Sequence, residues 1–415
     1  MPPLSCVTGL VCVLCGARYR RGLDGPCPAC GPEGVLDVTF DLARARRTLT
    51  AKALAARPRN MWRYRELLPV PERARRPPLS VGWTPLVPAP RLAAWAGVRA
   101  LVLKDEGRNP TASFKDRASV VGVTRALAAR ARVVACASTG NAASSLAGAA
   151  ASVGLSAVIF VPETAPEPKV AQLLVFGARV VRVRASYDAT WELCQRACAR
   201  HGWYNRNAAV NPSLVEGKKT CGLELGEQTG SGVPDWVAVS VGDGCTIAGI
   251  WKGLVEMRAL GFIPRLPRLL AVQAEGARAL ADAFRRGDET GTGDARTVAD
   301  SIAVGHPRNA RKALAAVRAS KGAFVTVADD AIVEAIGAAG RLAGVFGEPA
   351  AVACIAGLRR AVADGIVGQR ARVVAVVTGN GLKDAKTALR AVGKPFDLAP
   401  DDDALDALLR EHPPA

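Results

Sequence analysis

The sequence predicts an α/β protein built around parallel β-sheets, with a small metal-binding module ahead of them. Short apolar runs alternate with helical patterns through most of the chain, and the turns after several runs are rich in Gly, Ser and Thr. Strands and helices that alternate at this spacing are typical of parallel βαβ units. Two Cys-x-x-Cys pairs near the N-terminus predict the metal-binding module.

The composition favours a globular protein with a small anionic ligand. The chain has 415 residues, of which 49% are hydrophobic and 22% charged, and its formal net charge is +18. Such a positive excess suits a nucleic acid or an anionic ligand. The basic residues are not interleaved with aromatic ones, so no nucleic-acid partner is expected.

The apolar runs and the cysteines predict where the protein works. No apolar run approaches the roughly 20 residues that a membrane span needs, so no membrane partner is expected. There is no secretory signal pattern at the N-terminus. Apart from one early cluster, the cysteines are scattered singly, which is not a disulfide framework. These features predict a reduced, cytoplasmic protein.

The early cysteines have the spacing of a zinc ribbon. Each of the two Cys-x-x-Cys pairs is followed by a glycine that allows a tight turn. Four thiolates complete a closed tetrahedral shell, so the predicted zinc is structural rather than catalytic. A redox pair or a coincidental spacing is the alternative. The predicted ligands are Cys12, Cys15, Cys27 and Cys30.

The apolar pattern divides the rest of the chain into segments. The expected strands are 101–106, 133–137, 157–161, 179–183, 236–241, 268–273 and 372–377. The expected helices are 118–129, 141–153, 168–176, 188–200, one that ends near 260, and 328–345. Residues 41–80 predict a basic helical arm with a proline-rich linker, and the acidic tail from about 396 predicts a surface helix.

One lysine and three loops carry the side chains that suggest chemistry. Lys115 follows a turn-prone Asn-Pro pair and precedes an apolar helix, where a lone lysine is usually a solvated charge. The loop 138–141 presents hydroxyls, an amide and free N–H groups at a helix start, which suits a carboxylate. The glycine-rich loop 242–249 suits a phosphate, and Thr378 places a neutral hydroxyl after a core strand.

Pyridoxal 5'-phosphate requires these features together. An amine forms a Schiff base with its aldehyde, one loop holds its phosphate, another takes the carboxylate of an amino acid, and a hydroxyl meets its ring nitrogen. Each loop alone is a weak signal, and 242–249 lacks both the Walker lysine and the dinucleotide spacing. The combination predicts a pyridoxal-phosphate enzyme with a small amino-acid substrate.

The same segments resemble a known family. Residues 109–117, Asn-Pro-Thr-Ala-Ser-Phe-Lys-Asp-Arg, resemble the cofactor-lysine motif of the threonine synthases, in the tryptophan-synthase-β-like family of pyridoxal-phosphate enzymes. Residues 138–141 resemble its substrate loop, 242–246 its phosphate loop, and 378–384 its Thr-Gly-x-Gly-Leu-Lys-Asp motif. Gly347-Glu348-Pro349-Ala350 is a further landmark. The resemblance covers roughly residues 80–395, and some members also carry a zinc ribbon.

The resemblance implies a fold-type-II enzyme with two three-layer domains of parallel or mixed sheets behind the zinc ribbon. It divides the chain into the ribbon at 1–40, the arm and linker at 41–80, a catalytic body at 81–395 and a tail at 396–415. Within the body, a smaller subdomain of about 118–205 is inserted in a larger one formed by 81–117 and 206–395. The resemblance also implies a homodimer.

Residue roles follow from the matching motifs. Lys115 is implied as the Schiff-base lysine and proton shuttle, and Thr378 as the contact of the ring nitrogen. The other implied cofactor ligands are Asn141, Gly242, Asp243, Gly244, Cys245 and Thr246. The implied substrate ligands are Ser138, Thr139, Gly140 and Lys218. The implied reaction is that of a carbon–oxygen lyase: γ-elimination of phosphate from O-phospho-L-homoserine, followed by β-hydration to L-threonine.

The chain departs from the family pattern at two places. Ala112 and Ala118 stand where glycine is usual, and the site is expected to tolerate both. The threonine synthases tend to show Asn-Ser-x-Asn-Pro-x-Arg-Leu-Glu-Gly where this chain has 208–217, and that Asn, Ser and Arg grip the substrate phosphate. This chain has Ala208, Ala209 and Leu214 there. The candidates to replace them are Arg206, Asn207, Lys218 and Lys219.

Two other functions stay open. Because of these departures, the protein could be a β/γ-elimination or replacement enzyme for another amino acid, in specialised metabolism. It could also be a binding or regulatory protein that kept the cofactor fold and uses the ribbon for interactions, although an intact Lys115 argues against this. His306 fits either an ordinary loop histidine or a substrate-side residue.

Overall fold

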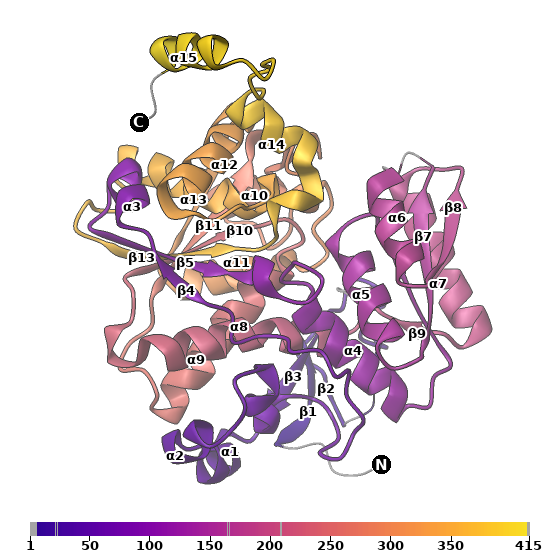
Figure 1. The fold of residues 1–415 in the computed structure, drawn as a ribbon. Helices are drawn as coiled ribbons and strands as arrows, with labels where there is room; N and C mark the ends of the chain where they lie inside the picture. The colour runs from indigo at the N-terminus through magenta and orange to yellow at the C-terminus, as the bar shows by residue number, and fades with distance from the viewer. Residues whose placement is uncertain are drawn as a thin grey trace.

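Three β-sheets organise the molecule, and helices cover the two larger ones (Figure 1). The computed structural model describes residues 6–20, 22, 24–163, 165, 167–207 and 210–412. Within these ranges, no helix has the length and apolar character that crossing a membrane requires.

The N-terminal sheet is small and antiparallel, with the order β2-β1-β3. Its strands are β1 (Val7–Cys12), β2 (Arg18–Tyr19) and β3 (Leu36–Phe40). The expected basic arm follows as two short helices, α1 (Leu42–Thr48) and α2 (Ala51–Ala55), and a 3-10 turn, η1 (Met61–Leu67). Asp41 and Thr50 cap the two helices by accepting backbone hydrogen bonds, which satisfies N–H groups that a helix start leaves free.

The largest sheet has six strands in the order β12-β11-β10-β13-β5-β4. All neighbours are parallel except β4, which pairs antiparallel with β5, so the sheet is mixed. The strands in chain order are β4 (Leu86–Pro88), β5 (Ala100–Asp105), β10 (Trp236–Ser240), β11 (Arg268–Ala274), β12 (Ala323–Val327) and β13 (Arg372–Val377).

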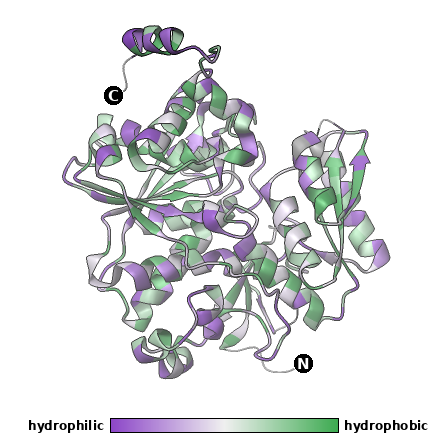
Figure 2. Ribbon diagram, in the orientation of Figure 1, coloured by the Kyte–Doolittle hydropathy of each residue, from purple (hydrophilic) through white to green (hydrophobic). Residues whose placement is uncertain are grey.

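Both faces of this sheet are buried, which explains why its strands read as continuous apolar runs. In β13, Val373 and Ala375 pack into the core on one side, and Val374 and Val376 into the core on the other. Figure 2 shows most of these strands in the hydrophobic colour. The first core includes α3 (Pro90–Ala96), α12 (Asp329–Ala343), α13 (Pro349–Ala363) and α14 (Ala385–Val392). The second includes α8 (Ser213–Thr229), α9 (Cys245–Leu260), α10 (Ala279–Arg286) and α11 (Ala310–Ala319).

The third sheet has four parallel strands in the order β8-β7-β6-β9. These are β6 (Val133–Ala137), β7 (Ser156–Pro162), β8 (Arg179–Val183) and β9 (Tyr204–Asn205). One core beside it includes α4 (Asp116–Ala128), α5 (Asn141–Ala151) and α6 (Glu167–Val175), and the other includes α7 (Tyr187–His201). The two larger sheets therefore form two three-layer units.

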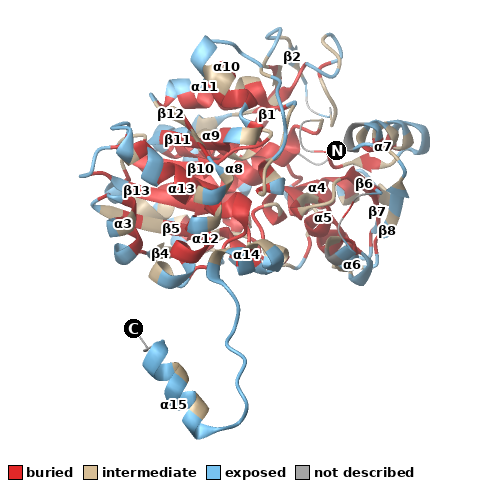
Figure 3. Cartoon of the chain, turned by 90° about the horizontal axis from the view of Figure 1, so that it is seen from above, coloured by how far each residue is buried: buried red, intermediate tan, exposed pale blue. Residues whose placement is uncertain are grey.

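The expected strands and helices are confirmed to within a few residues. The pattern did not predict several other elements, among them α8, α10, α11, β12 and α13. Helix α13 is apolar on nearly every side and shows no amphipathic stripe. The expected surface helix in the tail is α15 (Asp402–Glu411). It projects away from the body in Figure 1 and carries no buried residue, as Figure 3 shows.

Candidate active site

A cavity of about 900 Å³ lies where the two larger sheets meet. Parallel sheets place ligand sites at the carboxyl ends of their strands, and this cavity follows that rule. Residues 138–141 come directly after β6, 241–244 after β10, and Thr378 after β13, and all of them line it. Lys115, the residue before α4, also lines this cavity. The structure thus brings the lysine and the three predicted loops together.

The lysine segment is tied to the loop after β13 by main-chain hydrogen bonds. Phe114 N donates to Thr378 O at 2.8 Å, and Asn380 N donates to Ala112 O at 3.0 Å. Ser113 also forms a β-bridge with Gly379. These contacts fix Lys115 beside Thr378, two residues that the sequence separates by more than half of the chain.

The turn before Lys115 explains the usual glycine at position 112. Ala112 has a φ of 62°, in the left-handed region that costs an L-residue about 1–2 kcal/mol. Ala118 lies inside α4, where alanine is the favoured residue. The two alanines therefore differ in kind: the first is strained, and the second suits its helix.

A buried ion network holds the segment from behind. Arg117 Nε donates to Glu106 Oε2 at 2.7 Å, and Arg117 Nη1 to Glu224 Oε1 at 2.7 Å. Lys104 Nζ donates to Glu224 Oε2 at 2.9 Å. All four side chains are fully buried, so two cations are matched by two carboxylates directly behind the lysine turn.

The amine of Lys115 lies in an environment that favours its neutral form. Its pKa is lowered from 10.5 to about 8, chiefly by burial and also by the positive charges of Lys218 and Arg206. In the described part of the chain, the amine makes no hydrogen bond of its own. A desolvated amine of lowered pKa is the state in which lysine is a good nucleophile.

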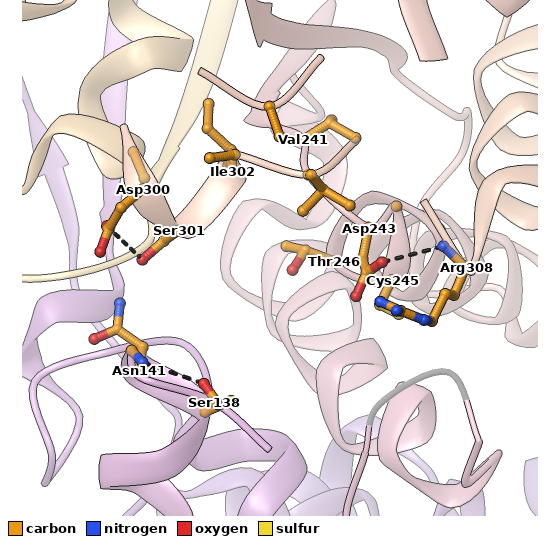
Figure 4. Close-up of a pocket in the computed structure, with 18 of the residues that line it drawn as sticks. Ser138, Asn141, Val241, Asp243, Cys245, Thr246, Asp300, Ser301, Ile302 and Arg308 are labelled. Carbon is orange, nitrogen blue, oxygen red and sulfur yellow. Dashed lines mark hydrogen bonds between the residues drawn. The ribbon is translucent and has the colours of Figure 1, made fainter. Parts of the chain in front are cut away.

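The loop 138–141 faces the other sheet across the cavity. Ser138 Oγ accepts from Gly140 N at 3.2 Å (Figure 4). Asn141 Nδ2 donates to Glu348 Oε1 at 2.6 Å. Burial raises the pKa of Glu348. A Cβ on Gly379 would lie 2.3 Å from Glu348 Oε1, so the glycine makes room for this carboxyl. In the sequence, the only signal for the place of Glu348 in the cavity is the family-like motif at 347–350.

The glycine-rich loop is shaped for a close approach. Gly244 has a φ of 89°, and a Cβ there would lie 2.7 Å from the Cβ of Ala313. Asp243 Oδ1 accepts from the main-chain N of Arg308 at 3.1 Å, which stitches the loop to the segment before α11 (Figure 4). Cys245 and Thr246 begin α9, so their N–H groups and the helix dipole favour an anion there. This loop and the amine of Lys115 fit the phosphate and the aldehyde of pyridoxal phosphate.

Two buried cations complete the cavity near Lys115. Arg206 and Lys218 are each 2% exposed, and both line the cavity. Arg206 Nη2 donates to Ser119 Oγ at 3.0 Å, and burial lowers the pKa of Lys218. Arg206 is one of the four residues that the sequence offers in place of the family's phosphate ligands, and it lines the cavity.

Residues 206–219 include the positions at which the chain differs from the family pattern. Some of them line the cavity and others lie in the core. Asn207 lines the cavity and accepts a hydrogen bond from Ala137 N at 3.1 Å, whereas Lys219 turns away to Glu216 at 2.7 Å. Leu214 is fully buried, and its Cδ2 lies 2.9 Å from where a Cβ on Gly122 would be. Ala208 and Ala209 lie outside the described residues. His306 is exposed at the cavity rim.

The four predicted metal ligands gather in the N-terminal sheet. The Sγ atoms of Cys12, Cys15, Cys27 and Cys30 all lie within 4.8 Å of one another. Cys12 Sγ is 3.9 Å from Cys30 Sγ, and Cys15 Sγ is 3.8 Å from Cys27 Sγ. A tetrahedron with Zn–S bonds of about 2.3 Å has edges of about 3.8 Å, so this set fits zinc. Gly16 and Gly31 adopt the left-handed conformation that the tight turns require.

Comparisons with known proteins identify the family of the chain. The family model for pyridoxal-phosphate-dependent enzymes matches residues 78–379. A threonine synthase of Methanocaldococcus jannaschii is 37% identical over 403 residues, which cover 96% of this chain and 99% of that protein. One of Methanosarcina acetivorans is 38% identical over 402 residues, covering 95% and 97%. The chain therefore belongs to the family of pyridoxal-phosphate-dependent enzymes. Within that family it is a threonine-synthase-like lyase.

Solved structures share the fold at lower identity. Threonine deaminase isoform 2 from Solanum lycopersicum is 22% identical with a TM-score of 0.63, covering 75% of this chain and 88% of that one. Maize serine racemase is also 22% identical with a TM-score of 0.63, covering 79% and 93%. The solved structures confirm the predicted α/β fold, and the family model and the threonine synthases confirm the predicted family and enzyme class.

Proposed function

We propose that the protein converts O-phospho-L-homoserine into L-threonine. The observation that carries this proposal is the pair of buried cations, Arg206 and Lys218, beside the amine of Lys115. The glycine-rich loop already offers an anion site for the cofactor phosphate. A second cationic site in the same cavity suits a substrate that brings a phosphate of its own. The threonine synthases among its relatives support this choice.

The residues present would divide the work as follows. Lys115 would hold the cofactor through Nζ, residues 242–246 would hold its phosphate, and Asn141 and Thr378 would flank its ring. When bound, pyridoxal phosphate supplies an electron sink for negative charge that develops next to the substrate nitrogen. Residues 138–140 would take the substrate carboxylate with their N–H and hydroxyl groups.

Proton movement would fall to Lys115. Its lowered pKa lets Nζ accept a proton from a substrate carbon and return it within one turnover. Arg206 and Lys218 would stabilise the departing phosphate by charge-assisted hydrogen bonds, each contributing about 1.5–3 kcal/mol. A neutral hydroxyl at Thr378 would leave the ring nitrogen largely unprotonated, which limits the sink and steers the course of the reaction.

The four-cysteine cluster would bind zinc in a structural role. Its thiolates form a complete tetrahedral set and leave no ligand position for a substrate. The cluster also belongs to a different sheet from the loops that line the cavity.

The test is phosphate release from O-phospho-L-homoserine by the holoenzyme, with threonine measured in the same sample. We expect phosphate and threonine in equal amounts, and no turnover of L-homoserine, which lacks the anion. A protein that shows the cofactor absorbance at about 410–430 nm but releases no phosphate would refute the proposal.

A second candidate is elimination or replacement on another amino acid. It is favoured by Leu214, which is buried against α4 instead of reaching the cavity. The same assay separates the two, because turnover of O-acetyl or thioether amino acids without turnover of the phosphate ester would select the second.

A further inference from the structure

The N-terminal sheet is joined to the body through strand β3 (Figure 1). Asp37 Oδ2 accepts from Lys252 Nζ at 3.1 Å, and Asp37 Oδ1 accepts from Lys312 Nζ. Lys252 Nζ also donates to Val38 O at 2.5 Å. At the end of the strand, the ring of Phe40 lies 3.7 Å from Lys219 Nζ. One short strand thus contacts lysines from three separate helices.

These lysines belong to a network whose charges balance only with Asp37. Glu216 accepts from Lys252 at 2.7 Å and pairs with Lys219 at 2.7 Å, and Glu256 pairs with Lys219 at 3.0 Å. The network has three lysines and three carboxylates, and Asp37 is the member that the N-terminal sheet supplies. The side chains of Lys219 and Glu216 are fully buried. Removing one partner of a buried charge network strands the opposite charge, which is costly.

Two of the three helices carry part of the cavity wall, and the third directly follows a segment that lines it. Lys219 on α8 follows Lys218, which lines the cavity, and Lys252 lies on α9, which begins at Cys245 of the glycine-rich loop. Lys312 lies on α11, directly after the segment whose main chain binds Asp243. A shift of any one helix therefore moves a residue that faces the cofactor or the substrate.

The helices also transmit movement to one another. A Cβ on Gly249 of α9 would lie 3.0 Å from the Cβ of Lys218, so the backbones of α8 and α9 are in close contact. Such closely packed elements shift together rather than deform separately.

The cysteine cluster sets the position of Asp37. Leu36 is the register partner of Cys12, and Val13 N donates to Val35 O at 3.0 Å. A Cβ on Gly34 would lie 2.5 Å from the Cβ of Cys27. Strand β3 is therefore held against the cysteine cluster at Leu36, and the next residue, Asp37, contacts the helices.

We propose that Asp37 is a positioning residue that links the cysteine module to the cofactor pocket. By pairing with Lys252 and Lys312 it holds α8, α9 and α11 in the arrangement that places the glycine-rich loop and Lys218. The N-terminal sheet thus helps to position the residues that bind anions in the cavity, and it is not an independent appendage.

The test is the dissociation constant of pyridoxal phosphate in the full-length Asp37→Asn variant, measured without substrate by the absorbance of the bound cofactor. We expect this constant to rise by about tenfold, because the loop that holds the phosphate shifts. Asp37→Glu keeps the charge and should recover most of the affinity. Glu33→Gln is the matched control, because it removes the same charge from an exposed site of the same module, and its constant should stay within about twofold of wild type.

A merely structural role gives a different result. The unfolding temperature of Asp37→Asn would then fall while its cofactor constant stays at the wild-type value, and that outcome overturns the proposal. Lys312→Gln cuts only the link to α11 and serves if Asp37→Asn does not fold; we expect a rise of about threefold, and an unchanged constant again overturns the proposal. Because no substrate is used, failure of the O-phosphohomoserine assay leaves this test intact.

Discussion

Two groups of buried cations lie near the lysine turn, and they differ in how their charges are balanced. Behind the lysine turn, Arg117 and Lys104 are fully buried and matched by the carboxylates of Glu106 and Glu224. Their pairing holds the pKa of Arg117 above its usual range, against the effect of burial. Facing the cavity, Lys115 and Lys218 have lowered pKa values, because burial and neighbouring positive charge act on both.

The difference shows that one group of charged residues stabilises the lysine turn, whereas the other is available to bind ligands. A matched network costs stability when one partner is removed, because the other charge is left in a low-dielectric interior. Neighbouring buried cations that lower one another's pKa favour the binding of a ligand's anionic groups. The first group therefore holds the site in place, and the second group binds.

The largest expected effect is on the lysine itself. Lys115→Ala should abolish the cofactor absorbance and lower turnover by about 10⁴-fold, because both the covalent link and the proton carrier are lost. Spectra and phosphate release measure the two losses. Lys52→Ala, on an exposed part of α2, should change neither. Normal turnover in Lys115→Ala would contradict the assignment of the site.

The matched network should respond in stability. Glu224→Gln strands the charges of Lys104 and Arg117, so the free energy of unfolding should fall by about 3–5 kcal/mol. Chemical denaturation measures it. Glu334→Gln removes an exposed carboxylate that pairs with Arg359 and should change the free energy by less than about 0.5 kcal/mol. Equal effects in the two variants would remove the distinction between a buried and an exposed pair.

The cavity cations should respond in binding instead. Arg206→Met should raise the KM for the phosphorylated substrate by about 10- to 100-fold, because charge-assisted hydrogen bonds of about 1.5–3 kcal/mol are lost. The cofactor absorbance should persist, and the loss of stability should be smaller than in Glu224→Gln, because Arg206 lines the cavity whereas Glu224 is enclosed between Lys104 and Arg117. An unchanged KM together with a large loss of stability would place Arg206 with the matched network.

The lowered pKa of Lys115 predicts a pH profile. The neutral amine captures the cofactor, so the rate of absorbance change on adding cofactor to the apoenzyme should rise about tenfold per pH unit below pH 8. The rate should level off above the pKa of about 8. Lys218→Met removes a neighbouring positive charge and should move the plateau to higher pH. A rate that keeps rising toward the ordinary lysine pKa of 10.5 would contradict the effect of burial and of the neighbouring cations on Lys115.

The smallest effect separates the two alanines of the lysine segment. Ala112→Gly removes a left-handed strain of about 1–2 kcal/mol. Glycine also makes the unfolded chain more flexible, which costs about 0.4–1 kcal/mol, so the net effect should be a slight stabilisation. Ala118→Gly is its matched partner inside α4 and should destabilise by about 1 kcal/mol. Denaturation midpoints decide, and effects of the same sign would contradict this account.

Much of the fold and part of the site could be predicted before the structure. Apolar runs such as 372–377 read as strands because both of their faces are buried, and Lys115 with its three loops suggested a cofactor because each loop carries its polar groups locally. Helix α13 was missed because it is buried all round. Arg206 could be offered only as one of four candidates, because an arginine in a basic chain carries no local sign of burial.

The sequence by itself determined the local chemistry: the cysteine spacing, the lysine turn, the glycine-rich loop and the order of strands and helices. These depend on neighbours within a few residues. Only the tertiary structure decided which charges are matched and which face the cavity. Glu224 meets Arg117, and Asp37 meets Lys252, across long stretches of chain. Such pairs depend on packing between distant elements, and no local pattern records them.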